Sequence, residues 1–139
     1  MKLIDLNYHA NNEYSNPHEV ISDHWPSLGY VDVLKKNISI EVIKHINYEG
    51  KMVVDNVKYG FFKSRNRFWY IPFRTHQYIS KQKPRFIIVQ GFVFPLQLIF
   101  LRYKLGDTCA ICLQHQGERP FKGLKGILQR FADRFVNGY

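Results

Sequence analysis

Hydrophobic residues in the second half of the chain form alternating strand-like and helix-like patterns. The runs at 86–89 and 109–114 are almost entirely apolar, which is typical of strands buried on both faces of a parallel sheet. Segment 124–135 carries apolar residues at helical spacing, and segment 95–104 is predicted as a short helix that Gly106 ends. The connections are too long for hairpins and suit right-handed βαβ units, so the sequence predicts a three-layered α/β fold.

The first half of the chain shows a weaker form of the same pattern. The expected elements there are strands at 3–6 and 39–46, a hairpin over 52–62, and helices over 25–35 and 68–82. The Asp55-Asn56 pair favours the tight turn of the hairpin, and the residue before Pro84 avoids helical backbone, which ends the second helix. We interpret the polar stretch 8–23 as a long loop and Gly138 as the cap of the C-terminal helix.

Length and composition favour one folded domain over residues 1–139. Hydrophobic residues make up 45% of the chain and aromatic residues 16%, which excludes a disordered protein. No apolar stretch approaches the ~20 residues that a membrane-spanning helix needs. Asp5 lies where a signal peptide would be apolar. We therefore expect a cytoplasmic protein without a spanning segment.

Cys109 and Cys112 form a Cys-x-x-Cys pattern that could indicate redox or zinc chemistry. They lie in a predicted strand, where side chains three positions apart face opposite sides of the sheet. A zinc site would also need a second ligand pair, which the sequence lacks. We therefore expect two separate core cysteines and no metal or other cofactor.

The net charge of +9 is concentrated in one part of the sequence. Every charged residue between Asn56 and Gly106 is basic. Such a block produces a positive field that attracts acidic lipid, a phosphorylated substrate or nucleic acid. A solvated basic surface without a dedicated partner remains the alternative.

Two of the predicted strands end in loops that are the best candidates for a ligand site, because open α/β sheets bind ligands outside the carboxyl ends of their strands. The candidate residues are Gln90, Gly91, His115, Gln116, Gly117, Glu118 and Arg119. A histidine there can hydrogen-bond a hydroxyl group or a phosphate oxygen, and a glycine lets the backbone approach a ligand. Glu118 and Arg119 could orient a ligand or pair with each other. Purely structural roles for the histidine and the glycines stay open.

Four segments carry a family resemblance when taken in this order: KPRFIIVQGFVFP, LRYKLG, QHQGERPFKGLK and QRFADRFVNGY. They resemble the N-terminal half of retaining, nucleotide-sugar-dependent glycosyltransferases of the GT-B fold. The likeness covers residues 80–139 closely and residues 24–63 more loosely. One departure is Arg85, where the family often has an aspartate.

The resemblance implies a Rossmann-like domain that receives the acceptor, while a second domain grips the nucleotide sugar. This chain resembles only the first domain, so it would be inactive alone. The acceptor would be a sugar, a glycolipid or a polysaccharide precursor, and the donor would be a substrate used without a metal. His115 matches the family's histidine that faces the transferred sugar, and Gly29 is the candidate for the loop that contacts donor phosphate.

The competing interpretation is a basic α/β binding module. Aromatic and basic residues interleave over 61–70 and could stack on single-stranded bases. The basic helix expected at 122–136 could contact anionic lipid, which would also suit a transferase that works at the inner membrane face. Nucleic acid is the less favoured partner because no recognised motif accompanies these residues. A glycosidase is disfavoured because acidic residues are scarce in the second half of the chain.

Overall fold

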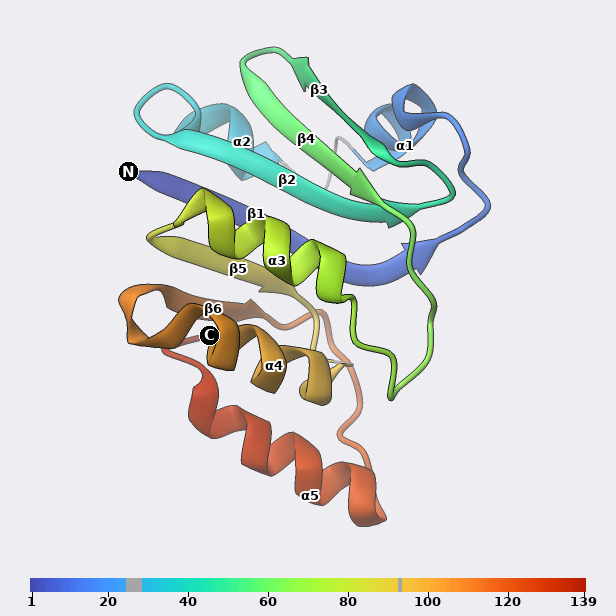
Figure 1. Cartoon of the computed structure of the whole chain (residues 1–139), viewed down its shortest axis with the longest axis vertical. Helices are drawn as coiled ribbons and strands as arrows, with labels where there is room; N and C mark the ends of the chain where they lie inside the picture. The colour runs from blue at the N-terminus through green and yellow to red at the C-terminus, as the bar shows by residue number, and fades with distance from the viewer. Residues whose placement is uncertain (25–28, 93) are drawn as a thin grey trace.

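The computed structural model describes residues 1–24, 29–92 and 94–139 and shows an α/β fold with a mostly parallel, six-stranded sheet (Figure 1). The strands are β1 (Lys2–Asn11), β2 (Ser39–Ile46), β3 (Gly50–Val54), β4 (Val57–Phe62), β5 (Phe86–Gln90) and β6 (Ala110–Gln114). The helices are α1 (Pro17–His24), α2 (Gly29–Leu34), α3 (Phe73–Gln82), α4 (Pro95–Leu105) and α5 (Gly123–Ala132), with short 3-10 turns at Gly106–Thr108 and Asp133–Phe135.

The strand order is β3-β4-β2-β1-β5-β6, and every neighbouring pair is parallel except β3 with β4. The chain moves outward from β1 in one direction through β2 and the β3–β4 hairpin. It then returns across the sheet through α3 and continues from β5 to β6 on the other side. The strand order therefore reverses between β1 and β5, and such a switch point leaves a crevice at the carboxyl ends of the strands.

Helices cover both faces of the sheet, which confirms the three-layered Rossmann-like α/β architecture. In Figure 1, α1 and α2 lie behind the sheet and α3 and α4 lie in front of it. Each face has its own apolar core: Val20 and Val31 pack behind the sheet, while Ile79 and Leu98 pack in front. Among the described residues, no helix has the length and apolar character needed to cross a membrane.

Strand β1 is longer than the sequence pattern predicts, and the predicted loop over 8–23 is wrong. Tyr8 and Ala10 are buried, so the apolar alternation continues past the expected end of the strand. The polar residues between them made this stretch resemble a loop, although they form the other face of the same strand. Residues Pro17–His24 then form α1, which packs through its buried Val20 and Ile21.

Strand β2 and the hairpin are confirmed, and Asp55 and Asn56 take the left-handed backbone that the turn requires, with φ of 50° and 65°. Helix α3 begins at Phe73 rather than at residue 68. The chain before it is held by the amide of Gln97, which donates to the carbonyls of Phe68 and Tyr70 and so keeps them out of a helix. Of the predicted helix over 25–35, residues 25–28 lie outside the described part and α2 covers Gly29–Leu34.

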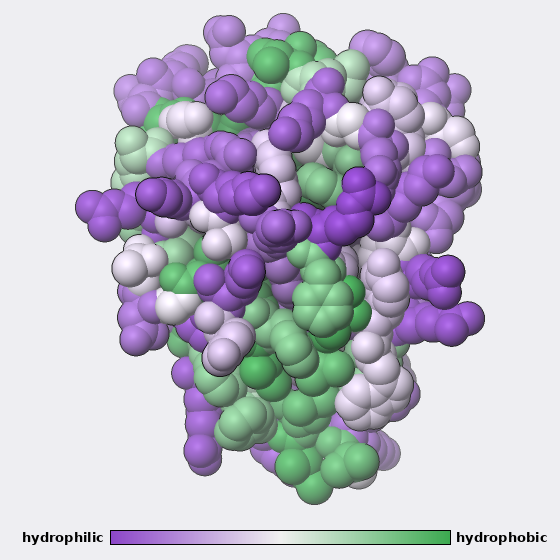
Figure 2. Space-filling view, in the orientation of Figure 1, coloured by the Kyte–Doolittle hydropathy of each residue, from purple (hydrophilic) through white to green (hydrophobic). Residues whose placement is uncertain are grey.

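The last helix, α5, packs mainly on α4. Gly138 does not cap it, contrary to the prediction: α5 ends at Ala132, and Gly138 forms a parallel bridge with Cys112 along the free edge of β6. Cys109 is buried in the front core and Cys112 is half-buried beside Gly138, so the two thiols face opposite sides, as expected. In Figure 2, apolar side chains gather over α4 and α5.

Candidate functional site

A polar cavity of about 760 Å³ opens at the switch point, at the carboxyl ends of β1, β5 and β6. Its lining residues are Asp5, Asn7, His9, Asn11, His24, Lys44, Gln90, Gly91, Phe94, Gln114, Gln116, Gly117 and Glu118. Carboxylates, amides and imidazoles dominate this set, and together they offer both donors and acceptors of hydrogen bonds. The cavity therefore suits a ligand rich in hydroxyl groups.

Asp5 forms the floor of this cavity and is only 1% exposed. Its Oδ2 accepts a hydrogen bond from Gln90 Nε2 at 2.6 Å and another from the Tyr30 hydroxyl. Its Oδ1 is buried and has no hydrogen-bond partner among the described residues. A buried carboxylate oxygen without a partner is costly, so this atom is the clearest opening for a ligand's donor group.

Burial raises the pKa of Asp5 to about 6, although the hydrogen bond from Gln90 and the charge of Lys44 both act to lower it. Lys44, on β2, is 3% exposed and lines the same cavity. Burial lowers the pKa of Lys44, and the charge of Asp5 opposes that shift. The floor thus holds two opposite charges that are both poorly solvated. Such a floor favours the binding of a polar ligand over the binding of an apolar one.

A β-bulge shapes the wall of the cavity. Leu6 pairs with Ile43, and Ala10 pairs with His45. Between these two pairs β1 advances by four residues while β2 advances by two. The pairing of β1 with β5 ends at Leu6 and Val89, and among the described residues the rest of β1 has no paired strand on that side. Asn7 and His9 project from this unpaired stretch into the cavity. Bulges commonly re-aim side chains beside functional sites.

The rim comes from the ends of β5 and β6, where Gln90 pairs in register with Gln114. Gln116 Nε2 donates to Gln90 Oε1 at 3.0 Å, which links the loop after β6 to the Asp5 floor through Gln90. Gly117 takes φ of 80°, and Glu118 Oε2 accepts from the Gln116 backbone N–H at 2.9 Å. The structure therefore brings together five of the predicted site residues: Gln90, Gly91, Gln116, Gly117 and Glu118.

The other predicted site residues lie beside the cavity but do not line it. The His115 side chain is 51% exposed, accepts from the Gly117 backbone N–H at Nδ1, and lies 3.3 Å from the Glu118 carboxylate. Arg119 is exposed on the same loop. Gly29 is exposed at the start of α2, and its neighbour Tyr30 reaches Asp5.

Sequence reasoning missed the side chains that β1 and β2 contribute, above all Asp5, Asn7, His9 and Lys44. The signal was present in the polar alternation at positions 5, 7, 9 and 11. Alternation of this kind is typical of a strand with one polar face, and here that face lines a cavity. Within the described ranges, no three His, Cys, Asp or Glu side chains gather closely enough to hold a metal ion.

The opposite face of β1 carries a second polar cluster, formed by Tyr8, His45, Thr75 and His76, which we call the imidazole cluster. His45 is buried and lies 2.8 Å from the Asn7 carbonyl through Nδ1 and 2.9 Å from the Thr75 hydroxyl through Nε2. Because a carbonyl only accepts, Nδ1 carries the hydrogen and Nε2 accepts from Thr75. His76 Nε2 is hydrogen-bonded to the Tyr8 hydroxyl at 2.7 Å.

The imidazole cluster is neutral. Burial lowers the pKa of His45 to about 4, outweighing its hydrogen bond to Asn7. Burial also lowers the pKa of His76 to about 4, with a further contribution from the charge of His45. Both ring nitrogens of His45 are hydrogen-bonded, so this residue ties α3 to the sheet and has no free nitrogen for a ligand.

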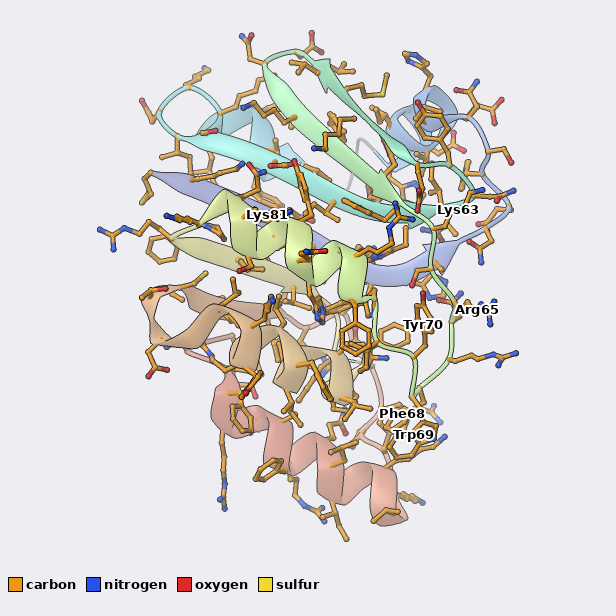
Figure 3. All side chains as sticks on the ribbon, viewed as in Figure 1. Lys63, Arg65, Phe68, Trp69, Tyr70 and Lys81 are labelled. Atoms are coloured by element: carbon orange, nitrogen blue, oxygen red, sulfur yellow. The ribbon has the colours of Figure 1, made fainter. Side chains whose placement is uncertain are left out.

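A larger and more open cavity, of about 1140 Å³, lies along the segment after β4 (Figure 3). Lys63, Arg65, Trp69 and Tyr70 line it, and the segment is fastened by Asn66, whose side chain hydrogen-bonds the backbone N–H and C=O of Ala10 at 2.7 Å each. These are the interleaved aromatic and basic residues that the sequence singled out. The fastening makes them a fixed surface.

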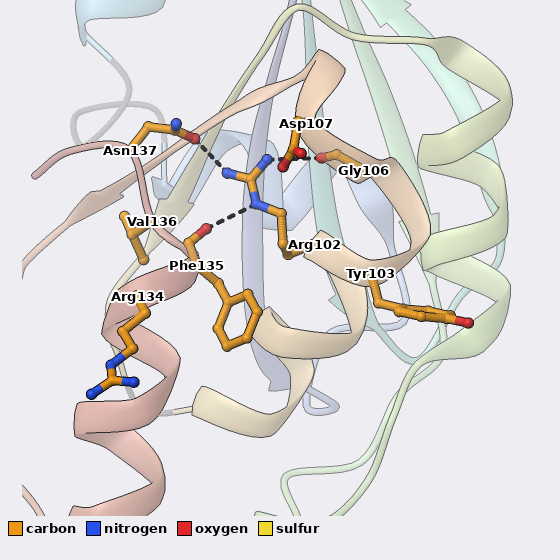
Figure 4. A pocket seen from close by; sticks show the side chains of 8 residues that line it. All are labelled: Arg102, Tyr103, Gly106, Asp107, Arg134, Phe135, Val136 and Asn137. Carbon is orange, nitrogen blue, oxygen red and sulfur yellow. Dashed lines mark hydrogen bonds between the residues drawn. The ribbon is translucent and has the colours of Figure 1, made fainter.

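A third cavity, of about 480 Å³, surrounds Arg102 near the C-terminus (Figure 4). The guanidinium group donates to the carbonyls of Phe135, Gly106 and Cys109 at 2.7–2.9 Å and to the side chain of Asn137. These contacts occupy the guanidinium and tie the chain after α5 to the end of α4. Arg102 is therefore structural. The switch-point cavity remains the stronger candidate for a ligand site.

No protein-family model and no curated protein sequence matches this chain.

Proposed function

We propose that this chain is the acceptor-side domain of a glycosyltransferase that takes its sugar from a nucleotide sugar. In this proposal the switch-point cavity holds a hydroxyl-rich acceptor, and a separate donor-binding domain supplies the nucleotide sugar. The chain alone would bind the acceptor and transfer nothing.

The observation that carries the proposal is the unpartnered Oδ1 of Asp5 on the floor of a cavity lined by amides and carboxylates. A sugar hydroxyl donates one hydrogen bond and accepts others, so it can satisfy Asp5 and use the amides of Gln90 and Gln116 at the same time. A hydrogen bond to a charged oxygen of this kind contributes about 1.5–3 kcal/mol. An apolar ligand would leave Asp5 unsatisfied.

Chemically, transfer requires the acceptor hydroxyl to be held against the anomeric carbon while the departing nucleotide diphosphate is stabilised. Positioning and charge stabilisation supply most of such a rate enhancement. In this chain Asp5 and Gln90 would orient the acceptor. His115 on the rim would face the transferred sugar and hydrogen-bond a hydroxyl group or a phosphate oxygen.

Calorimetric titration at pH 8 with methyl glycosides of glucose, galactose, mannose and N-acetylglucosamine tests the proposal. We expect at least one glycoside to bind, and Asp5→Asn to weaken its binding about tenfold or more. The matched control is Asp55→Asn, which makes the same chemical change at the hairpin turn, and its affinity should equal that of the wild type. Failure of every glycoside to bind, or equal binding by Asp5→Asn, would refute the proposal.

One observation favours a second candidate function, the binding of single-stranded nucleic acid. Trp69 is 58% exposed, and Lys63 and Arg65 line the same open cavity. Phe68, by contrast, already packs edge-on against Phe121, and Lys125 Nζ lies 4.8 Å from its ring centroid. A short oligonucleotide in the same calorimeter distinguishes the two. Tight oligonucleotide binding that Trp69→Ala abolishes and Asp5→Asn leaves intact would replace the glycosyltransferase proposal.

A further inference from the structure

The outer surface of α5 carries large apolar side chains that point away from the protein. Leu124 is 74% exposed and Ile127 is 57% exposed, and Phe131 continues the same stripe one turn later. Residues at this spacing share one face of a helix. Trp69 is also exposed and belongs to the segment whose Phe68 packs against Phe121, just before α5. We call Leu124, Ile127, Phe131 and Trp69 the docking face.

The inner surface of α5 holds the helix firmly on the domain, so the docking face cannot turn inward. Ala132 is buried in the front core. Gly126 sits so close to the Phe121 carbonyl that a Cβ there would lie 2.3 Å from its oxygen. The Gln129 side chain donates to the Phe92 carbonyl at 2.9 Å and accepts from the Phe121 backbone N–H at 3.0 Å. The exposed stripe is therefore a fixed feature of the folded domain.

The charges around the docking face are almost all positive. Helix α5 contains no acidic residue, and the exposed cations on and beside it are Lys122, Lys125, Arg130 and Arg134. Arg65 and Arg67 are exposed in the segment that carries Trp69. Within the described part of the chain, none of these six cations forms an ion pair. They are thus available to an anionic partner.

We propose that the docking face binds the surface of an anionic lipid bilayer, with α5 lying in the plane of the interface. A helix with Leu, Ile and Phe on one side and Lys and Arg beside them is the pattern that inserts shallowly among lipid headgroups. A tryptophan suits the same depth, because its ring is apolar and its N–H is polar. The inference goes beyond the proposed function and does not depend on it.

The alternative occupant, a second copy of this chain, fits the charges less well. Two docking faces in contact would bring Lys125 and Arg130 of one copy close to the same cations of the other, and like charges across an interface are unfavourable. An anionic bilayer instead neutralises every one of them. Charge complementarity therefore selects the membrane surface.

Co-sedimentation with vesicles tests the inference. The probes are vesicles of phosphatidylcholine alone and vesicles of phosphatidylcholine mixed with phosphatidylglycerol, at low and at high salt. We expect binding to the anionic vesicles only, weakened by salt. The emission of Trp69 should shift to shorter wavelength on binding, and this shift should be absent in Trp69→Phe.

Matched variants separate the two parts of the docking face. Leu124→Ser with Ile127→Ser should weaken binding about tenfold or more, whereas Val53→Ser, an equally exposed apolar residue on β3, should leave it unchanged. Lys125→Gln with Arg130→Gln should weaken binding about fivefold for each cation removed. The control pair Lys36→Gln and Lys58→Gln removes the same charge elsewhere and should have a much smaller effect. All of these positions are exposed, so circular dichroism should show unchanged folding.

Three results would overturn the inference. The first is equal binding to both kinds of vesicle, and the second is equal losses in the docking-face variants and their controls. The third is a wild-type dimer in sedimentation equilibrium that Leu124→Ser with Ile127→Ser dissociates, together with no vesicle binding. That result would assign the docking face to self-association.

Discussion

Strand β1 carries a buried polar cluster on each face, and the two clusters differ in how completely they are satisfied. On one face, both ring nitrogens of His45 are hydrogen-bonded, and His76 is paired with Tyr8. On the other face, Asp5 is just as deeply buried but one of its oxygens has no hydrogen-bond partner among the described residues, and it lines a cavity. A completed network fastens the fold, whereas an incomplete one beside a cavity is prepared for a ligand.

The same bulge in β1 serves both clusters. It frees the Asn7 carbonyl for His45 on one face, while the Asn7 side chain lines the cavity on the other. Local distortion of a strand at the switch point therefore both fastens α3 and shapes the candidate site.

The imidazole cluster should make the protein unstable in acid. The folded-state pKa values of His45 and His76 are about 4, below the ordinary value of 6.5. The unfolded chain therefore binds more protons between these values, and the free energy of unfolding falls as pH drops from about 6.5 toward 4. The loss should reach about 3 kcal/mol for each histidine. Urea unfolding at a series of pH values measures it, and His45→Gln should remove about half.

Asp5 should have the opposite effect on stability. Its folded-state pKa, about 6, lies above the ordinary 3.8, so its contribution is fully present below pH 3.8 and is lost as pH rises through 6. Asp5→Asn removes a buried charge, and at pH 8 it should raise the free energy of unfolding by about 1–3 kcal/mol. A variant that binds glycosides worse yet unfolds less readily would be the signature of a ligand site. Destabilisation of Asp5→Asn at pH 8 would mean that the carboxylate has a structural role instead.

Thr75→Val keeps the shape of the side chain but leaves His45 Nε2 without its donor. We expect a loss of about 1–2 kcal/mol in the free energy of unfolding at pH 8. Thr108→Val, which removes an exposed hydroxyl that bonds the Leu105 carbonyl at 3.2 Å, should change stability by less than about 0.5 kcal/mol. Equal effects from the two variants would argue against a tightly paired cluster.

Gln116→Ala should barely affect stability, by less than about 0.5 kcal/mol, because the side chain is exposed on the rim. Glycoside affinity should nevertheless fall about two- to tenfold, since the variant removes one amide from the site and releases Gln90. Gln77→Ala, at an exposed position on α3, is the control and should bind like the wild type. An unchanged affinity in Gln116→Ala would show that the ligand does not reach this part of the rim.

The sequence predicted most accurately the strands that are buried on both faces. Strands β5 and β6 are continuous apolar runs, and because parallel strands end at one edge, their register brings the two predicted loops together, with Gln116 hydrogen-bonded to Gln90. Strand β1 was underestimated because Asp5 and the polar residues after it interrupt the apolar pattern. Those polar residues form the floor and wall of the cavity. The residues that obscured the strand in the sequence are therefore also residues of the candidate site.

Helix α5 shows what an apolar pattern cannot predict. Its apolar spacing correctly predicted a helix, yet the pattern alone could not tell which side would be buried. In the fold, Ala132 and Gly126 face inward while Leu124 and Ile127 remain exposed. Periodicity reports that a helix has an apolar stripe, whereas only the packing on α4 decides what covers it.

Backbone amide shifts measured by NMR during titration with the methyl glycosides would locate the bound ligand on the domain. We predict that the largest changes will cluster at Asp5, Asn7, Gln90 and Gln116, around the switch-point cavity, while His45 and Thr75 on the other face of the sheet stay unchanged. Changes centred on the imidazole cluster or on the segment around Trp69, or no changes at all, would contradict the assignment of the switch-point cavity as the ligand site.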